Sequence, residues 1–209
     1  MLHVDHVIYG TGDVDAAANR LYQEHGLASV VGGRHPAWGT ENRIVPLGDA
    51  YLELMTVFDP ELATKTPLGR FAAQRISRGD GFLGWMAAGE GFAERAAALG
   101  LQPETFARQR PDGSEVRWRL AGLETMIADP PLPGLLAWED PDALPGRTPV
   151  EHRGVAPRGF AWLLAGDERR LDDWVGPAAE LPLRIVDDQP PGLRAAAIAL
   201  ADGAEIVIR

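Results

Sequence analysis

Cysteine is absent from the 209-residue sequence, which also contains only one lysine and three serines. The absence of cysteine excludes disulfide frameworks, thiol nucleophiles and cysteine-ligated zinc or iron–sulfur sites. The single lysine, Lys65, lies in a polar stretch before Pro67, so Schiff-base chemistry has little support. None of the serines lies in a nucleophile motif, and no glycine-rich phosphate-binding motif follows a strand. Serine hydrolase and nucleotide-binding functions are therefore poor interpretations.

Positive charge and long apolar runs are scarce as well. Lys and Arg total 20 against 30 Asp and Glu, which gives a net charge of −10 and a calculated pI near 4.9. This balance argues against a nucleic-acid partner. No apolar run approaches the ~20 residues that cross a bilayer, and residues 1–10 contain no Lys or Arg that would begin a signal peptide. We expect a cytoplasmic protein that makes no contact with a membrane.

Three segments of the chain repeat one local pattern, in which an apolar strand leads through a glycine-containing turn into an alanine-rich or amphipathic helix. The predicted strands are Leu2–Tyr9, Phe82–Ala88 and Phe160–Ala165. The predicted helices are Val14–His25, Phe92–Leu99 and a third that ends at Trp174. Asp13 and Asp167 precede the first and third helices and are predicted N-caps, because an aspartate side chain accepts hydrogen bonds from the first free amides.

Three further strands are predicted after each helix, separated by turns such as Pro111-Asp112-Gly113 and Ala201-Asp202-Gly203. The sequence therefore predicts an α+β fold built from repeated β-α-β-β-β units. We expect units at residues 1–65, 81–140 and 158–209, a linking helix within 66–80 and a proline-rich loop at 141–157. One such unit exposes an apolar sheet face, so two units are expected to pair around a cleft.

Several segments of the first unit, and one after it, have a familiar form. They are Leu2–Val7 (LHVDHV), Gly12–Ala17 (GDVDAA), Gly32–Asn42 (GGRHPAWGTEN), Tyr51–Leu54 (YLEL) and Leu135–Asp140 (LLAWED), followed by His152. Together they resemble the vicinal oxygen chelate superfamily of glyoxalases, bleomycin-resistance proteins and extradiol dioxygenases. Within it, the resemblance is to glyoxalase-like domain proteins. It implies a cupped mixed sheet formed by paired units, with a cleft for a small-molecule ligand.

The resemblance also implies a divalent metal (Zn, Fe, Mn or Ni), held by His, Glu, His and Glu on the first and last strands of two units. His6 and Glu53 match two of these positions, and Glu139 lies near a third. The first strand of the second unit carries Trp85 in the region where the resemblance places a histidine. With His35, the residues His6 and Glu53 also have the composition of a two-histidine, one-carboxylate metal site.

The residues themselves leave alternatives open. Glu53 lies between Leu52 and Leu54, where an ionised carboxylate needs a partner, a metal or water. It is either an ion-pair partner for an arginine or a metal-binding or proton-transferring group. His35 follows two glycines and is either part of an ordinary solvated turn or a ligand or acid/base at the rim of the cleft. Thr40 and Asn42 follow in the same segment and are predicted to bind substrate.

Tryptophans are candidates to line an apolar pocket, namely Trp38, Trp85, Trp118 and Trp138. Two functions follow. One is a metal-dependent enzyme of lyase, isomerase or dioxygenase type, with Glu53 and His35 as catalytic groups, metal ligands from His6, Glu53, His35 and Glu139, and a homodimeric assembly. The alternative is a metal-free protein that binds or sequesters a small apolar molecule. A third possibility is a dimerising scaffold with a residual cleft.

Overall fold

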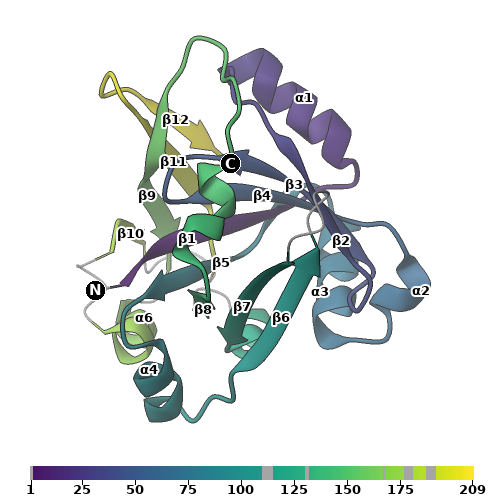
Figure 1. Cartoon of the computed structure of the whole chain (residues 1–209), viewed down its shortest axis with the longest axis vertical. Helices are drawn as coiled ribbons and strands as arrows, with labels where there is room; N and C mark the ends of the chain where they lie inside the picture. The colour runs from purple at the N-terminus through teal and green to yellow at the C-terminus, as the bar shows by residue number, and fades with distance from the viewer. Residues whose placement is uncertain (1, 110–114, 130–131, 167, 177–180, 187–191) are drawn as a thin grey trace.

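The computed structural model describes residues 2–109, 115–129, 132–166, 168–176, 181–186 and 192–209. The predicted turn at Pro111-Asp112-Gly113 and the predicted cap Asp167 lie outside these residues. The elements follow one another (Figure 1) as β1 (Leu2–Gly10), α1 (Val14–His25), β2 (Val30–His35), β3 (Thr40–Pro46), β4 (Tyr51–Val57), α2 (Pro60–Ala63), α3 (Pro67–Ile76), β5 (Gly81–Gly89), α4 (Phe92–Ala98), β6 (Glu104–Gln109), β7 (Glu115–Ala121), α5 (Leu123–Ala128), β8 (Gly134–Trp138), the 3-10 turns η1 (Pro141–Ala143) and η2 (Pro145–Arg147), β9 (Pro157–Ala165), α6 (Glu168–Val175), β10 (Leu183–Ile185), β11 (Ala195–Leu200) and β12 (Glu205–Ile208).

The first helix shows why the chain turns back after β1. The side chain of Asp13 accepts hydrogen bonds from the backbone amides of Asp15 and Ala16, which confirms the predicted N-cap. Helix α1 ends at Gly26, whose φ of 72° is a left-handed conformation that glycine adopts without strain. The chain then leaves the helix in the direction of β2.

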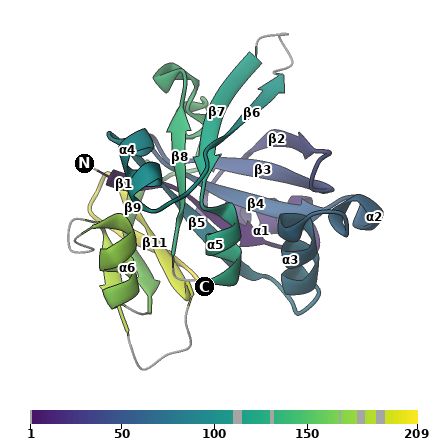
Figure 2. The same cartoon turned by 90° about the horizontal axis from the view of Figure 1, so that it is seen from below.

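Two units with the same internal order form the large sheet. Its eight strands are arranged as β2-β3-β4-β1-β5-β8-β7-β6, and β1 runs antiparallel to β5 at the junction between the units. Within each unit the first and last strands are parallel neighbours, β1 with β4 and β5 with β8. The sheet curves, so that the β6–β7 hairpin rises out of the plane of β2–β4 (Figure 2). This is the predicted α+β fold with cupped mixed sheets.

The third segment repeats the order of elements but not their pairing. Its strands form a separate four-stranded sheet in the order β10-β9-β11-β12. In the first two units the strand after the helix lies at the far edge of its unit, whereas here β10 pairs in parallel with β9 directly. Strand β11 then pairs antiparallel with the other side of β9. Strand β9, the first strand of this segment, therefore has a partner strand on each side within the four-stranded sheet.

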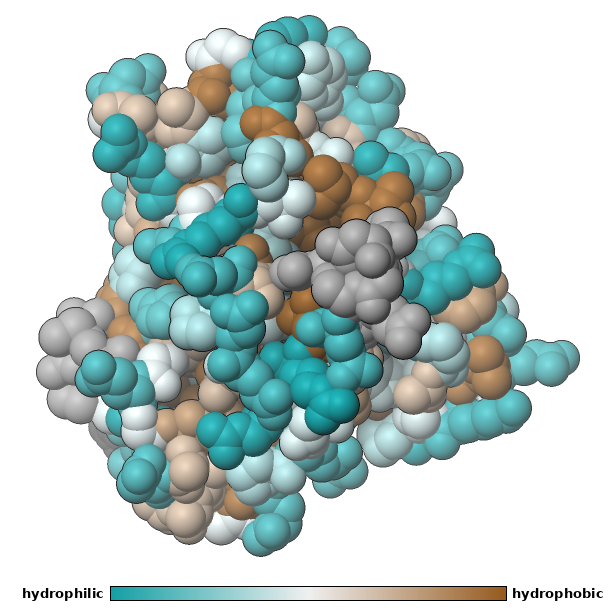
Figure 3. Space-filling view, in the orientation of Figure 1, coloured by the Kyte–Doolittle hydropathy of each residue, from teal (hydrophilic) through white to brown (hydrophobic). Residues whose placement is uncertain are grey.

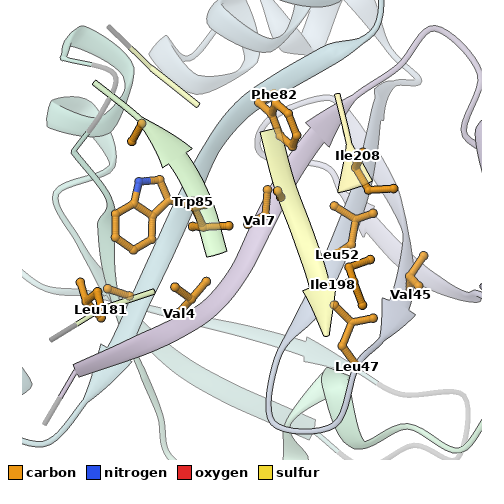
Figure 4. Packing of buried hydrophobic residues seen from close by; sticks show 14 of the residues in the cluster. Val4, Val7, Val45, Leu47, Leu52, Phe82, Trp85, Leu181, Ile198 and Ile208 are labelled. Carbon is orange, nitrogen blue, oxygen red and sulfur yellow. The ribbon is translucent and has the colours of Figure 1, made fainter. Parts of the chain in front are cut away.

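Two apolar cores lie on opposite faces of the large sheet. On the outer face, Val7, Leu52 and Trp85 pack with α1, α4 and the third segment, including Ile198 of β11 (Figure 4). On the inner face, Ile8, Met55, Met86 and Leu136 pack with helices α3 and α5, which lie side by side (Figure 2). The inner face is thus closed at one end by these two helices. Among the described residues, no helix has the length and apolar character that crossing a membrane requires.

Two local features differ from the sequence analysis. Strand β2 continues to His35, so the two glycines before Arg34 belong to a strand and not to a loop. The pairing of β2 with β3 shifts between Val31 and Gly33, which makes Gly32 an extra residue in the strand. Helix α5 has six residues, too few for the helical periodicity of its sequence to predict it.

Candidate functional site

A cleft opens on the inner face of the large sheet, with α3 and α5 at one end and the turn at Pro145 at its rim. Its polar lining comes from the first unit, namely His6, His35, Asn42, Tyr51 and Glu53. The second unit contributes the apolar and aromatic side chains of Leu83, Met86, Trp118, Leu120, Leu123, Met126, Leu136 and Trp138. We call this volume the inner cleft.

The inner cleft continues outward into a wider groove between the edge strands β2 and β6. Trp38, Trp118 and Pro145 line both spaces, so the two are continuous. Val31 of β2 lies at this groove and, at 74%, is the large hydrophobic residue that stands exposed among the described residues. Apolar side chains gather in the middle of the molecular face that contains β2 and the β6–β7 hairpin (Figure 3). The inner cleft therefore opens to the surface through a groove that is lined largely by apolar side chains.

His6 is held in one orientation by three neighbours. The pairing of β1 with β5 shifts between Val4 and His6, so Asp5 is an extra residue and its carboxylate lies beside His6. Asp5 Oδ1 is 2.6 Å from His6 Nδ1, and Asp5 Oδ2 accepts a hydrogen bond of 2.8 Å from the indole Nε1 of Trp138. The ring of Tyr51 stacks on the imidazole at 4.4 Å. Because a carboxylate only accepts, His6 Nδ1 carries a proton and donates it to Asp5, and Nε2 is directed towards Glu53.

Glu53 lies opposite the free nitrogen of His6. The distance from Glu53 Oε2 to His6 Nε2 is 3.5 Å, and both side chains are buried. The other carboxylate oxygen, Oε1, accepts a hydrogen bond of 2.5 Å from Asn42 Nδ2 on the neighbouring strand. Asn42, Glu53, His6 and Asp5 therefore form one connected polar row across β3, β4 and β1. This pattern is typical of acid/base machinery, since the outer members fix the position of the inner pair.

A row of aromatic rings continues from this polar row towards the outside. Trp138 is 5.6 Å from Trp118, Trp118 is 6.3 Å from Phe106, and Phe106 is 5.4 Å from Trp38, measured between ring centroids. His35 lies next to Trp38 at 5.3 Å and its Nδ1 is 3.2 Å from the hydroxyl of buried Thr40. His35 thus belongs to the rim, where the inner cleft meets the outer groove, and Thr40 orients it.

The comparison with known proteins decides the family. The sequence pattern of the glyoxalase-like domain family matches residues 4–161, about three quarters of the chain. The chain belongs to the glyoxalase-like domain family. It is a member of the vicinal oxygen chelate superfamily, as the resemblance implied. No protein with curated annotation matches it in sequence.

One solved structure supports the fold of this glyoxalase-like protein, and a second is similar over part of the chain. A hypothetical protein from Staphylococcus aureus is 16% identical, with a TM-score of 0.62, over 100% of this chain and 86% of that one. A methylmalonyl-CoA epimerase from Mycobacterium tuberculosis is 17% identical over 65% of this chain and 85% of that one, with a TM-score of 0.44. At these identities the likeness concerns the fold alone.

The strand register identifies which residues of the second unit correspond to the polar row of this glyoxalase-like protein. His6 pairs with Met86 across the junction of the units, and each stands at the same place in its own unit, opposite Tyr51 and Gly134 respectively. Counting along β4 and β8 from these pairs, Glu53 corresponds to Leu136. The pairs of β3 with β4 and of β7 with β8 then make Trp118 the counterpart of Asn42. The counterparts of the polar groups are thus a methionine, a leucine and a tryptophan.

This donor set does not fit the four-ligand metal site that the resemblance implies. His6 Nε2 and Glu53 Oε2 are two donors, but Met86 and Leu136 stand where the second histidine and glutamate would be. Protein sites for zinc have at least three protein ligands. Among the described residues, no three or more His, Asp or Glu side chains are grouped to hold a metal ion. The side chains on the inner face therefore do not make up the four-ligand site.

The predicted site residues separate into two groups. The inner cleft brings together His6, His35, Trp38, Asn42, Glu53 and Trp138, and Thr40 lies behind His35. Trp85 does not line the inner cleft: it points to the outer face, where it is buried in the larger core (Figure 4). Glu139 follows β8, its amide donates to the carbonyl of Arg117, and its side chain is not among those that line the inner cleft.

Sequence reasoning missed Asp5 and Met86. In a regular strand Asp5 faces away from His6, because neighbouring side chains point to opposite faces. Only the extra residue in β1 brings its carboxylate to the histidine. The adjacent pair Asp5-His6 was the available signal, since carboxylates frequently orient histidines. Met86 was missed because its neighbour Trp85 was predicted to line the pocket. Trp85 lies on the outer face of β5, and Met86 lies on the inner face.

Proposed function

We propose that the protein is a small-molecule enzyme of isomerase or lyase type that works by proton transfer and without a metal. The observation that carries the proposal is the polar row Asp5–His6–Glu53–Asn42, in which hydrogen bonds with Asp5 and Asn42 hold His6 and Glu53 with Nε2 and Oε2 3.5 Å apart, beside the apolar wall of the inner cleft. The metal-dependent reactions that the family resemblance implies, including the dioxygenase type, draw no support from the donor set of Met86 and Leu136.

In this proposal His6 Nε2 is the general base. A C–H bond of the substrate breaks, its proton forms the new N–H bond on Nε2, and its electron pair stays on the substrate. The charge that develops on the imidazole is stabilised by Asp5, whose Oδ1 lies 2.6 Å from Nδ1. A positioned base of this kind contributes about 10²–10⁴ in rate.

Glu53 is the second proton carrier. Its Oε2 is 3.5 Å from His6 Nε2, so both groups reach the same few atoms of a bound molecule. Return of the proton to another position completes an isomerisation. If a leaving group departs from the adjacent carbon with its bonding electrons, the retained pair forms a double bond and the reaction is an elimination. Asn42 fixes Glu53 by donating to Oε1.

The walls of the cleft support this chemistry by excluding water. The second unit places Met86, Leu120 and Leu136 opposite the polar row. Such an apolar wall lowers the local dielectric and strengthens the interactions of the few charged groups inside. The tryptophans bind the body of the substrate by burial and stacking, and His35 stands at the rim to meet its outer end.

The test uses three small carbon acids of similar size, namely neutral hydroxyacetone, cationic aminoacetone and anionic 2-oxobutanoate. Each is incubated with the protein in D₂O containing EDTA, and replacement of C–H by C–D is followed by proton NMR against a buffer control. We expect exchange with at least one compound, and a loss of about 10²–10⁴ in that rate in His6→Gln and Asp5→Asn. His3→Gln is the matched control, because His3 lies exposed on the same strand.

Two results would overturn this proposal. Exchange that appears only after Zn²⁺, Mn²⁺, Ni²⁺ or Fe²⁺ replaces EDTA would establish the metal-dependent enzyme instead. No exchange with any compound, together with saturable quenching of tryptophan fluorescence, would establish the metal-free binding protein. The aromatic row from Trp138 to Trp38 is the observation that favours this second candidate.

A further inference from the structure

The polar row turns hydrogen-bond acceptors towards the inner cleft. With Nδ1–H donated to Asp5, the neutral His6 ring keeps Nε2 as an acceptor. Glu53 lines the inner cleft, and its Oε2 lies 3.5 Å from His6 Nε2, while its Oε1 is taken by Asn42 Nδ2. The amide oxygen of Asn42 is enclosed beside Gly32 and is not presented to the cleft. Glu53 Oε2 is therefore the carboxylate oxygen that a ligand with N–H donors would meet.

The charges around the inner cleft select the same kind of ligand. Two carboxylates, Asp5 and Glu53, flank one imidazole, and the described residues that line the inner cleft include no Lys or Arg. Arg34 lines the outer groove, but its guanidinium pairs with Glu41 at 3.0 Å and lies over the ring of Phe58. An anion entering this site would lose its hydration without gaining a cationic side chain as a partner, whereas a cation would gain the carboxylate of Glu53.

The aromatic row adds a second interaction for a cation. Trp38, Phe106, Trp118 and Trp138 follow one another with ring centroids 5.4 to 6.3 Å apart, and three of the four line the inner cleft. The face of an aromatic ring attracts a positive charge within about 6 Å of its centroid, most strongly for tryptophan. The cleft thus combines acceptors, negative charge and aromatic faces.

We propose that the ligand of this cleft is a small organic ammonium ion: a protonated amine on a short apolar body, with an N–H group directed at Glu53 Oε2 and His6 Nε2 left free for the proton transfer. The amine thereby occupies the half of the site where the family resemblance implies a metal. The inner cavity has a volume of about 80 Å³, room for several non-hydrogen atoms, since one water needs roughly 10–15 Å³.

This assignment rests on the proposed proton transfer and makes it more specific. His6 Nε2 and Glu53 Oε2, the two groups that meet the reacting atoms in this proposal, are acceptors and do not stabilise an oxyanion on the substrate. A protonated nitrogen beside the reacting C–H bond withdraws electrons and stabilises the charge from within the substrate. These acceptors and the base chemistry therefore point to one substrate class.

The test compares three ligands of nearly equal shape and different charge, namely 3-methylbutylamine, 3-methylbutan-1-ol and 3-methylbutanoate. Binding to the full chain at pH 7.5 with EDTA is followed by ¹H–¹⁵N NMR of the tryptophan indole groups. We expect the amine to bind at least about tenfold more tightly than the alcohol, and the carboxylate to bind most weakly. Glu53→Gln should remove the preference for the amine, while Glu61→Gln, on exposed α2, should retain it.

The outcomes separate this inference from the proposed function. Equal binding of amine and alcohol, or tighter binding of the carboxylate, would overturn the ammonium assignment, whether or not carbon acids exchange. A preference for the amine without exchange of any carbon acid would support the assignment and reject the enzyme. Stoichiometric Zn²⁺ binding by the wild-type protein that displaces the amine would assign the acceptors to a metal and overturn the inference. The charge series needs no variant, so it stands even if Glu53→Gln fails to fold.

Discussion

In the eight-stranded sheet, His6 pairs with Met86 and Glu53 corresponds to Leu136, so each polar group of the first unit has an apolar counterpart in the second. The two units share strand order, parallel neighbours and an outer helix. They differ in the chemistry of the face that they turn towards each other. The first unit holds the polar row, and the second unit provides leucine, methionine and tryptophan side chains.

This division explains how two carboxylates remain buried in one cleft. Asp5 is fully buried and is satisfied by His6 and by Trp138, while Glu53 is satisfied by Asn42. A buried charge is tolerated when it is hydrogen-bonded in this way. A second polar half would need as many partners again, or a metal ion to neutralise it. The apolar half instead leaves a cleft with a carboxylate and an imidazole on one side and apolar side chains on the other.

The largest effect, on metal binding, is expected when polar residues of the first unit are introduced at their counterparts in the second unit. In the double variant Met86→His/Leu136→Glu, a histidine and a glutamate would stand at the counterparts of His6 and Glu53. Four such ligands form a complete site for a divalent ion, so we expect the variant to gain one equivalent of Zn²⁺ per chain by isothermal titration calorimetry.

The single variant Met86→His and the wild type are the controls, and we expect neither to bind Zn²⁺ stoichiometrically. If the double variant folds, by its circular dichroism, yet binds no more metal than the wild type, the counterparts have been misassigned. The difference between the halves would then lie in backbone geometry rather than in these two side chains.

A smaller effect, on the free energy of unfolding, is expected at Trp138, a residue of the second unit that donates a hydrogen bond to the polar row. Trp138 of β8 donates to Asp5 Oδ2, whereas Trp118 of β7 is part of the same aromatic row and has no such bond. Trp138→Phe leaves a buried carboxylate oxygen without its donor, so it should lower the free energy of unfolding by about 1–3 kcal/mol more than Trp118→Phe. Urea unfolding of both variants measures the difference. Equal losses would mean that the indole contributes only by packing.

Much of the first unit was predictable from local signals. Helix α1 was predicted with its exact bounds because Asp13 caps it and Gly26 ends it. His6 and Glu53 were both selected as site residues because strand alternation places each on a defined face, and the structure brings them together. The first strand was predicted as Leu2–Tyr9 and is observed as Leu2–Gly10, because the glycines that follow it mark its end.

The features that the sequence did not reveal depend on register and pairing. One extra residue in β1 brings Asp5 to His6, and the residue types of that strand do not predict where the extra residue lies. The choice between Trp85 and Met86 depends on which face of β5 is inner, and a strand that is apolar on both faces does not reveal this. The third segment has the predicted elements, but its strand order is a matter of long-range pairing.

The smallest effect, on thermal stability, is expected in residues 139–156. This segment follows β8 of the second unit and hydrogen-bonds to the first unit. His152 Nδ1 accepts a hydrogen bond of 3.0 Å from the amide of Ala28, and its Nε2 donates to the carbonyl of Pro46 at 3.1 Å. Partial burial lowers the pKa of His152 below its usual value of 6.5, because it disfavours the charged ring. Protonation of Nδ1 would also break the bond from Ala28, and Pro145 of the same segment lines the cleft.

The sign of the pH effect follows from this lowered pKa. The neutral ring stabilises the fold fully above about pH 6.5, the value in the unfolded chain, and this contribution disappears as the pH falls through the lower pKa of the folded state. The melting temperature of the wild type should therefore fall more between pH 7.5 and 5.5 than that of His152→Gln. His25→Gln, at the end of α1, should keep the wild-type dependence. Parallel curves for wild type and His152→Gln would show that the attachment of this segment to the first unit does not depend on the neutral histidine.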